Sequence, residues 1–337
     1  MHFKIICIVN KGGGKLENKV VTQTITNATV ISNNSNTSKR LKQFKKSGPL
    51  YVLLLPSIIL LICFTYLPMY GLIIAFKDYS PTLGILESPW VGLKHFIQFF
   101  NSYQFDLTIK NTLNISLYSI LVGFPLPIAL AILCNQLRIG MFKKVFQVTT
   151  YLPHFISTMV MCGMILIFLS PSNGLISNFL GLIGIEMPNV LSKASFFSSI
   201  YVWSDVWQHI GWDSIIYLAA LSAINPTYYE AATMDGASKM QKILHIDIPL
   251  LLPTAMILLI LRAGSLLSVG FEKVLLLQNP LNIAGSEVIS TYVYKIGLQN
   301  FQYSLSTAIG LFNTVVNIVI LLLVNWMSKK LTKTSLF

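Results

Sequence analysis

The chain has 337 residues, of which 54% are hydrophobic and only 11% are charged, and its mean hydropathy is +0.66. A soluble domain carries about 25% charged residues, so this composition excludes an ordinary soluble protein and indicates a membrane protein. The formal net charge of +12 is arranged as membrane orientation signals are, so we expect no nucleic-acid partner.

Residues 1–48 differ in composition from the rest of the chain. They are rich in Asn, Thr, Ser and Lys and have little apolar content beyond residues 3–9. Such a segment cannot bury enough apolar surface to offset the entropy of ordering it. We therefore expect a polar, disordered cytoplasmic tail at 1–48, a transmembrane domain at 49–331 and a short cytoplasmic tail at 332–337.

Six segments are long and apolar enough to cross a bilayer as helices, which takes about 20 residues each. They lie at about 50–76, 112–134, 145–169, 196–223, 250–271 and 306–327. The sequence therefore predicts an all-α integral membrane protein with six transmembrane helices. If the N-terminus is inside, the inner segments hold 17 of the 24 Lys and Arg residues, the outer segments hold 6, and Arg262 lies in the fifth span. The positive-inside rule then predicts that both termini are cytoplasmic.

Polar side chains interrupt the fourth predicted span. Helical spacing places Trp203 and Trp207 on one face. Asp205 and His209, with Trp212 or Asp213, form a second stripe. Charges at membrane depth are costly, so these groups should face a pore, water or a neighbouring helix. Aromatic rings stack on sugars and carboxylates bind sugar hydroxyls, although bonding within the helix bundle explains the same pattern. The candidate substrate-pathway residues are Trp203, Asp205, Trp207, His209 and Asp213. Arg262 is a candidate partner for one of these carboxylates.

A polar loop at 225–253 separates the fourth and fifth predicted spans. Asn225–Pro226 suits the start of a helix over 227–234, and Gly236 permits a sharp turn before a second helix at about 238–246. Pro249 and Pro253 follow. The small side chains around the turn would let another protein surface approach closely, but an ordinary amphipathic loop has a similar composition.

The order of residues in this loop is more specific than its composition. Glu230–Ala231–Ala232 is followed by Asp235–Gly236–Ala237 and then by Ile246–Asp247–Ile248–Pro249. This pattern, after the fourth of six spans, resembles the EAA loop of permeases of binding-protein-dependent ABC importers. The resemblance implies a type I importer permease fold in the bacterial plasma membrane. It also implies that a separate ATPase is coupled through five residues, namely Glu230, Ala231, Ala232, Asp235 and Gly236.

Further matches extend the resemblance over about 46–331. Segments 48–51, 55–56, 70–71, 75–79, 211–221, 270–273, 279–280 and 291–294 are similar to the LplB-like permeases for polysaccharides or oligosaccharides. That group implies a second homologous permease in a heterodimer, a dimer of cytoplasmic subunits that bind ATP and Mg²⁺, and an extracellular solute-binding lipoprotein. It implies no cofactor in this chain. Asp213 departs from the Asn expected there and would either change ligand preference or pair with a neighbour.

Two other classes of function compete with this interpretation. Asp205 and His209 would suit a proton relay in a secondary sugar carrier, which would transport alone and ignore ATP. A membrane enzyme acting on lipid-linked sugars would need clustered acid, base or metal-binding residues. The sequence offers no such cluster, so we expect no catalytic residue and no metal site.

Overall fold

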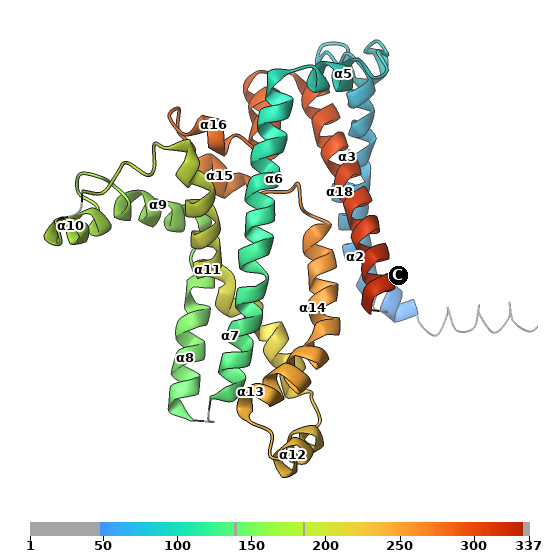
Figure 1. Ribbon diagram of the computed structural model, residues 1–337. Helices are drawn as coiled ribbons and strands as arrows, with labels where there is room; N and C mark the ends of the chain where they lie inside the picture. The colour runs from blue at the N-terminus through green and yellow to red at the C-terminus, as the bar shows by residue number, and fades with distance from the viewer. Residues whose placement is uncertain (1–47, 138–139, 185, 333–337) are drawn as a thin grey trace, which may run out of the picture. The chain divides into compact units, whose positions relative to one another are not determined.

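The computed structural model describes residues 48–137, 140–184 and 186–332, and the chain divides into two compact units, Met1–Pro68 and Met69–Phe337. The predicted tails lie outside the described residues, apart from Gly48, at one end, and Thr332, at the other. Figure 1 labels the helices, and those labels are used below.

The first predicted span is confirmed as an apolar helix, since Tyr51–Phe76 has the length and composition of a membrane span. It consists of α2 (Gly48–Leu61), the π-helical turn η1 (Ile62–Tyr66), α3 (Leu67–Met69) and the 3₁₀ segment η2 (Tyr70–Phe76). In η1 the amide of Leu67 donates to the carbonyl of Ile62, one residue farther back than in an α-helix. Such a widened turn accommodates Pro68, which cannot donate a backbone hydrogen bond.

The second span is confirmed within a 34-residue helical stretch, Tyr103–Gln136. Two short helices, α4 (Gly84–Glu87) and α5 (Lys94–Phe100), precede it, and it consists of α6 (Tyr103–Gly123) and α7 (Pro125–Gln136). Pro125 stands in the first turn of α7, where its missing N–H leaves no helical hydrogen bond unmade.

The third predicted span, 145–169, is not a straight helix. It consists of α8 (Met141–Tyr151), the 3₁₀ turn η3 (Leu152–Phe155) and α9 (Thr158–Phe168), with a bend of 98° between Met141–Phe155 and Thr158–Phe168. Pro153 stands in η3, the backbone of Ile156 is extended, and the Ser157 hydroxyl accepts a hydrogen bond from Val160 N to begin a new helix. Apolar composition alone does not reveal this break.

The fourth span corresponds to α11 (Ala194–Ser222), which follows α10 (Leu175–Leu182). Its 29 residues reach about 44 Å at 1.5 Å per residue, enough to cross a bilayer. By length and composition together, however, the described residues contain four helices that qualify as spans, or five if the bent pair counts as one, and α11 is not among them. The number six therefore stays a prediction.

The fifth predicted span, 250–271, ends earlier than expected. A continuous helix runs through α13 (Lys239–Lys242), the π turn η4 (Ile243–Asp247) and α14 (Ile248–Ala263), and then stops. Residues 264–270 are not helical, and Asn317 Oδ1 accepts a hydrogen bond from Leu267 N at 2.9 Å. Gly264 and this side-chain bond favour the break over another helical turn.

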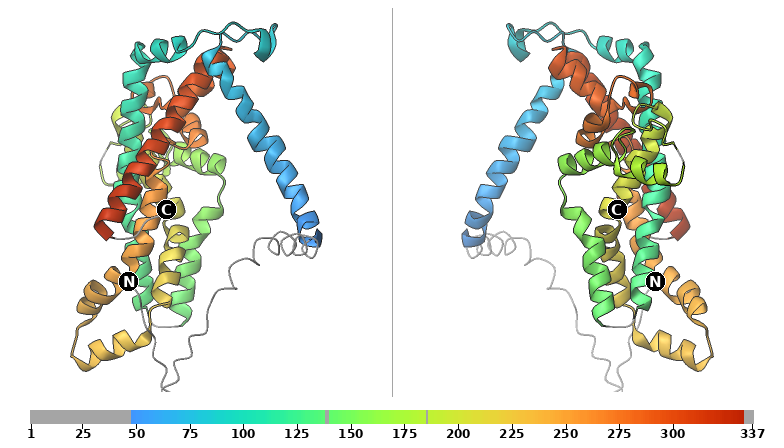
Figure 2. Two further views of the ribbon diagram at one scale, coloured as in Figure 1. Left: turned by 90° about the vertical axis from the view of Figure 1, so that its right-hand side faces the viewer. Right: turned by 90° about the vertical axis from the view of Figure 1, so that its left-hand side faces the viewer.

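The remaining helices complete the second unit. They are α12 (Pro226–Met234), α15 (Phe271–Leu277), α16 (Ile283–Ser286), α17 (Ile289–Tyr294) with η5 (Lys295–Gln299), and α18 (Tyr303–Thr332). The last contains the sixth predicted span. Within this unit, α12 and α13 lie at one end and α5 at the opposite end (Figures 1 and 2). This agrees with their predicted inner and outer sides.

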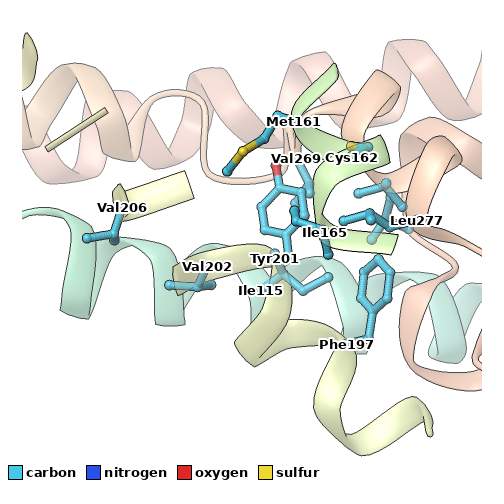
Figure 3. Close-up of a cluster of buried hydrophobic side chains, with 12 residues drawn as sticks. Ile115, Met161, Cys162, Ile165, Phe197, Tyr201, Val202, Val206, Val269 and Leu277 are labelled. Carbon is cyan, nitrogen blue, oxygen red and sulfur yellow. The ribbon is translucent and has the colours of Figure 1, made fainter. Parts of the chain in front are cut away.

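Helix α11 lies at the centre of the second unit and packs against α6, α7, α8, α14 and α16. Figure 3 shows the largest buried cluster, in which Tyr201 lies among apolar side chains that include Ile115, Met161 and Val269. The Tyr201 hydroxyl accepts a hydrogen bond from Gly270 N at 3.1 Å, which satisfies a polar group inside this cluster. The core thus holds the polar stripe of α11 against the chain that follows α14.

Candidate functional site

Three polar side chains of α11 form one stripe along the helix. Asp205, His209 and Asp213 follow each other at intervals of four residues, so their side chains lie on neighbouring turns. His209 Nδ1 is 3.1 Å from the backbone oxygen of Asp205 and 3.4 Å from its carboxylate Oδ1. The structure therefore brings together three of the five residues predicted to line a substrate pathway.

Two cations from later in the chain compensate these carboxylates. Arg262, at the C-terminal end of α14, forms a short ion pair with Asp213, as predicted for one of the carboxylates. Lys273 in α15 is only 5% exposed, donates to the carbonyl of Tyr201 at 3.0 Å and lies 3.4 Å from Asp205 Oδ1. Sequence reasoning missed Lys273, which it counted among the outer basic residues, although its apolar surroundings offered a signal.

Two larger cavities border this charged cluster, besides a small one of about 10 Å³ that is lined by Asp205, His209, Asp213 and Arg262 among others. One, of about 180 Å³, is lined by Ser116, Ser119, Tyr201, Asp205, Arg262 and Ser265 among others. The second, of about 280 Å³, is lined by Gly123, Pro127, Asp213, Tyr217, Arg262 and Ser265 among others. Arg262 and Ser265 therefore border both cavities. Hydroxyls and charged groups around an open space are the groups that bind a hydroxyl-rich ligand.

The two predicted tryptophans lie away from these cavities. Trp203 Nε1 donates to the hydroxyl of Tyr118 at 2.9 Å. Trp207 lines an apolar cavity of about 340 Å³ together with Met161, Met164, Ile165, Phe168 and Ser204. The tryptophan that approaches the polar stripe is Trp212, which stacks on His154 with ring centroids 4.3 Å apart, and His154 in turn lies 5.4 Å from the ring of His209.

The predicted helix of the inner loop is present as α12, with defined ends. The Asn225 side chain accepts a hydrogen bond from Thr227 N, and Pro226 occupies the first turn. At the other end Gly236 has φ 75°, Gly236 N donates to Thr233 O, and Ala237 N donates to Ala232 O. These two bonds form a Schellman motif, which explains why glycine stands at the predicted hinge.

The five predicted coupling residues lie together on this short helix and its turn. Glu230, Ala231, Asp235 and Gly236 are exposed, and Ala232 is half-buried. Met234, beside them, is 88% exposed. The segment is therefore a small exposed surface at the end of the unit opposite α5 (Figures 1 and 2).

The second helix of the loop begins with a capping box, in which Ser238 and Gln241 exchange hydrogen bonds with each other's backbone amides. It then runs without interruption through η4 into α14, whereas the sequence predicted a separate short helix. Pro249 stands in the first turn of α14, immediately after the π turn, and so the prolines do not end the helix.

A buried carboxylate, Asp247, lies under this loop, and sequence reasoning gave it no role. It accepts hydrogen bonds from the Tyr229 hydroxyl at 2.5 Å and from Gln136 Nε2 at 3.2 Å. Burial and the neighbouring carboxylate of Asp247 raise the pKa of the Tyr229 phenol, so it stays protonated and acts as the donor at neutral pH. The available signal was a lone acid between Ile246 and Ile248.

No group of three or more His, Cys, Asp or Glu side chains that could hold a metal ion occurs in the described residues. The polar groups of α11 are instead compensated by Arg262 and Lys273.

Comparison with known proteins identifies the family. Residues 123–333 match the model of the binding-protein-dependent transport system inner membrane component. The polygalacturonan/rhamnogalacturonan transport system permease protein YteP of Bacillus subtilis (strain 168) is 42% identical over 288 residues, covering 86% of this chain and 90% of that protein. Protein LplB of the same organism is 39% identical over 293 residues, covering 87% and 92%.

A solved structure gives the same answer for the fold. A chain of a bacterial ABC transporter involved in the import of the acidic polysaccharide alginate matches with a TM-score of 0.81 and 44% identity, covering 87% of this chain and 99% of that chain. The same fit, with 88% of this chain covered, is found for the bacterial alginate ABC transporter in complex with an alginate pentasaccharide-bound periplasmic protein.

These findings confirm the predicted resemblance, including its LplB-like group, and the ABC importer permease fold. They make the chain a multi-pass transport subunit of the bacterial cell membrane and not an enzyme. The chain belongs to the family of inner-membrane components of binding-protein-dependent transport systems.

Proposed function

We propose that this chain is the permease subunit of an ATP-driven importer for an oligosaccharide or polysaccharide fragment. It forms the translocation pathway with a second, homologous permease and receives the sugar from an extracellular binding lipoprotein. ATP and Mg²⁺ are bound by a pair of separate cytoplasmic subunits. The names of the similar proteins support the class of substrate, since YteP is a polygalacturonan/rhamnogalacturonan permease and the solved neighbour imports alginate.

The cluster on α11 supports a polar pathway at this place. The partly exposed side chains of Asp205 and Asp213 each face a cavity that also carries serine hydroxyls and Arg262. His209 borders a small cavity of about 10 Å³, together with both carboxylates and Arg262. Sugar hydroxyls both donate and accept hydrogen bonds, so a wall with carboxylates, hydroxyls and a guanidinium can bind them in several orientations. A pathway role for Trp203 and Trp207 has less support. Trp203 is hydrogen-bonded to the hydroxyl of Tyr118, and Trp207 lines an apolar cavity.

The observation that carries the coupling role is the geometry of α12. A nine-residue helix with caps at both ends presents Glu230, Ala231 and Met234 to the outside, and its small side chains allow close approach of another protein. A rigid exposed helix can receive force, whereas a loose loop would absorb it. On this basis the ATPase docks on α12 and its turn.

The docking role can be tested by cross-linking in intact membranes of the complete transporter. Single cysteines placed along 228–238, above all at the exposed Met234, should cross-link to the ATP-binding subunit. A cysteine in place of Ile97, which is 57% exposed on α5 at the opposite end, should not. Absence of any cross-link from 228–238 would contradict the docking role.

The same preparation separates the proposal from a proton-coupled carrier. Glu230→Lys reverses the charge of an exposed coupling residue and should reduce ATP-driven sugar uptake while insertion into the membrane is unchanged. Uptake that continues without ATP and collapses with the proton gradient would favour the carrier based on Asp205 and His209.

A further inference from the structure

Asp247 has the most unusual environment of the acidic side chains in the inner loop. It is completely buried, with 0% exposure, at the end of the π turn η4. A buried carboxylate is unfavourable unless donors replace its water. Within the part of the chain that the structure describes, no lysine or arginine forms an ion pair with Asp247. Neutral donors from two other elements therefore hold this charge.

The first donor belongs to the coupling helix. Tyr229 is half-buried on α12, immediately before the exposed Glu230, and its hydroxyl is 2.5 Å from Asp247 Oδ1. Another side-chain bond from α12, Lys242 Nζ to Thr233 Oγ1 at 2.8 Å, stays on the surface of the same loop. The tyrosine bond is thus a direct connection from α12 into the protein interior.

The second donor belongs to α7. Gln136 is the last residue of that helix, and its Nε2 is 3.2 Å from Asp247 Oδ2. Helix α7 packs on α11, and its residue Pro127 lines the cavity that also contains Asp213 and Arg262. Asp247 is also continuous with α14, which ends next to Arg262. One carboxylate therefore joins α12 to both helices that lead toward the charged cluster.

We infer that Asp247 is a positioning residue that transmits the movement of the coupling helix α12 to α7 and α14. The inference rests on the proposed docking of an ATPase on α12. Hydrogen bonds to a charged acceptor are about twice as strong as those between neutral groups. A carboxylate can therefore keep α12 and α7 connected when either helix moves. Because both of its oxygens are occupied, displacement of Tyr229 reaches Gln136 through a single side chain.

The test uses the complete transporter in liposomes and measures the ATP hydrolysed per sugar imported. Tyr229→Phe removes the bond to α12, and Gln136→Leu removes the bond to α7. Each should raise the ATP used per sugar by at least about fivefold, the lower end of typical coupling between sites. Tyr66→Phe, which alters a 61% exposed tyrosine in the first span, is the matched control and should leave the ratio unchanged.

A double variant distinguishes positioning from mere stability. Tyr229→Phe leaves the carboxylate with one donor, which lowers the thermal stability of the complex, and adding Asp247→Asn removes the buried charge. We expect the double variant to recover thermal stability without recovering the ratio of ATP to sugar. Recovery of both, or an unchanged ratio in both single variants, would overturn the positioning role.

The cross-link from a cysteine at Met234 distinguishes this inference from the docking proposal. It should form equally well with Tyr229 intact and in the Tyr229→Phe variant, because that substitution changes the interior and not the exposed face. If it forms in both proteins and the ratio does not change, the inference about Asp247 fails and docking stands. If it forms in neither protein, docking fails and the inference fails with it.

Discussion

At the residue scale, the ion pair between Asp213 and Arg262 joins α11 to the end of α14 in the middle of the polar cluster. Their side chains are 29% and 39% exposed, so the pair is neither fully buried nor free in solvent. Removing one partner leaves the other charge uncompensated, whereas removing both eliminates the problem. The energetic role of the pair can therefore be read from the difference between single and double variants.

Arg262→Met should lower the free energy of unfolding of the purified complex by about 1–3 kcal/mol, the cost of a polar group left unsatisfied. The double variant Arg262→Met with Asp213→Asn should recover most of that loss. Thermal unfolding in detergent measures both. Lys94→Met, which breaks an ion pair with Asp78 whose side chains are 56% and 49% exposed, should cost less than about 0.5 kcal/mol. A double variant as unstable as the single one would contradict this account.

The same residues show how far sequence can lead. Helical spacing is sufficient to place Asp205 and His209 on one stripe with either Trp212 or Asp213. The burial cost of charge is sufficient to expect Arg262 beside one of the carboxylates. The choice of Asp213 depends on the rotation of α14 against α11. The pairing of Lys273 with Asp205 depends on the path of the non-helical segment 264–270. Neither the rotation of α14 nor the path of this segment can be deduced from the periodicity of the sequence.

At the element scale, close helix packing depends on individual glycines. Gly211 lies where α11 crosses α8, and a Cβ at this position would collide with the carbonyl group of Thr150. Because the obstacle is backbone, it cannot rotate away as a side chain would. Gly211 thus fixes the distance between the polar stripe of α11 and the bent third segment.

Gly211→Ala should therefore destabilise the protein by about 1–3 kcal/mol, as overpacked cores do. Gly163→Ala is the matched control, since Gly163 lies in α9 with no atom within 4 Å of an added Cβ. This control should be neutral or stabilising by up to about 1 kcal/mol, the difference in helix propensity. The midpoints of thermal unfolding of the two variants test this prediction. Equal midpoints would show that α8 moves away from the added methyl group without loss of stability.

The breaks in the third and fifth predicted spans share a physical cause. Hydropathy measures how well side chains tolerate lipid or core, and it does not report where backbone hydrogen bonds change direction. Apolar residues stand on both sides of the break at Ser157, and Leu266, Leu267 and Val269 continue the apolar pattern after α14 has ended. Non-helical backbone at such depth needs protein partners, and Asn317 supplies one for Leu267 N.

At the scale of the whole molecule, α11 can be identified as a spanning helix only from its length and from the helices that pack around it, and not from its composition. The polar stripe keeps it outside the set of helices that are apolar enough, yet its length and central packing are those of a spanning helix. The predicted orientation, with 17 of the 24 basic residues inside, is consistent with α12 and α5 at opposite ends of the second unit. Counting apolar segments and counting charges are thus complementary.

The exposure of the polar stripe predicts that this chain is not stable alone. The side chains of Asp205 and His209 are 42% and 36% exposed, and Asp213 is 29% exposed, although a charge that faces lipid costs about 2.5–3.5 kcal/mol near the centre of a span. A second permease that faces this stripe would replace lipid by protein and by a water-filled pathway.

Co-expression with a homologous permease should therefore increase the amount of folded chain extracted from membranes, and native mass spectrometry should show one copy of each. The control is the double variant with Asp213→Asn and Arg262→Met, which removes one charge of the stripe together with its partner. Its yield should depend less on the second permease. A stable complex of two copies of this chain, obtained in equal yield without any partner, would replace the heterodimer by a homodimer.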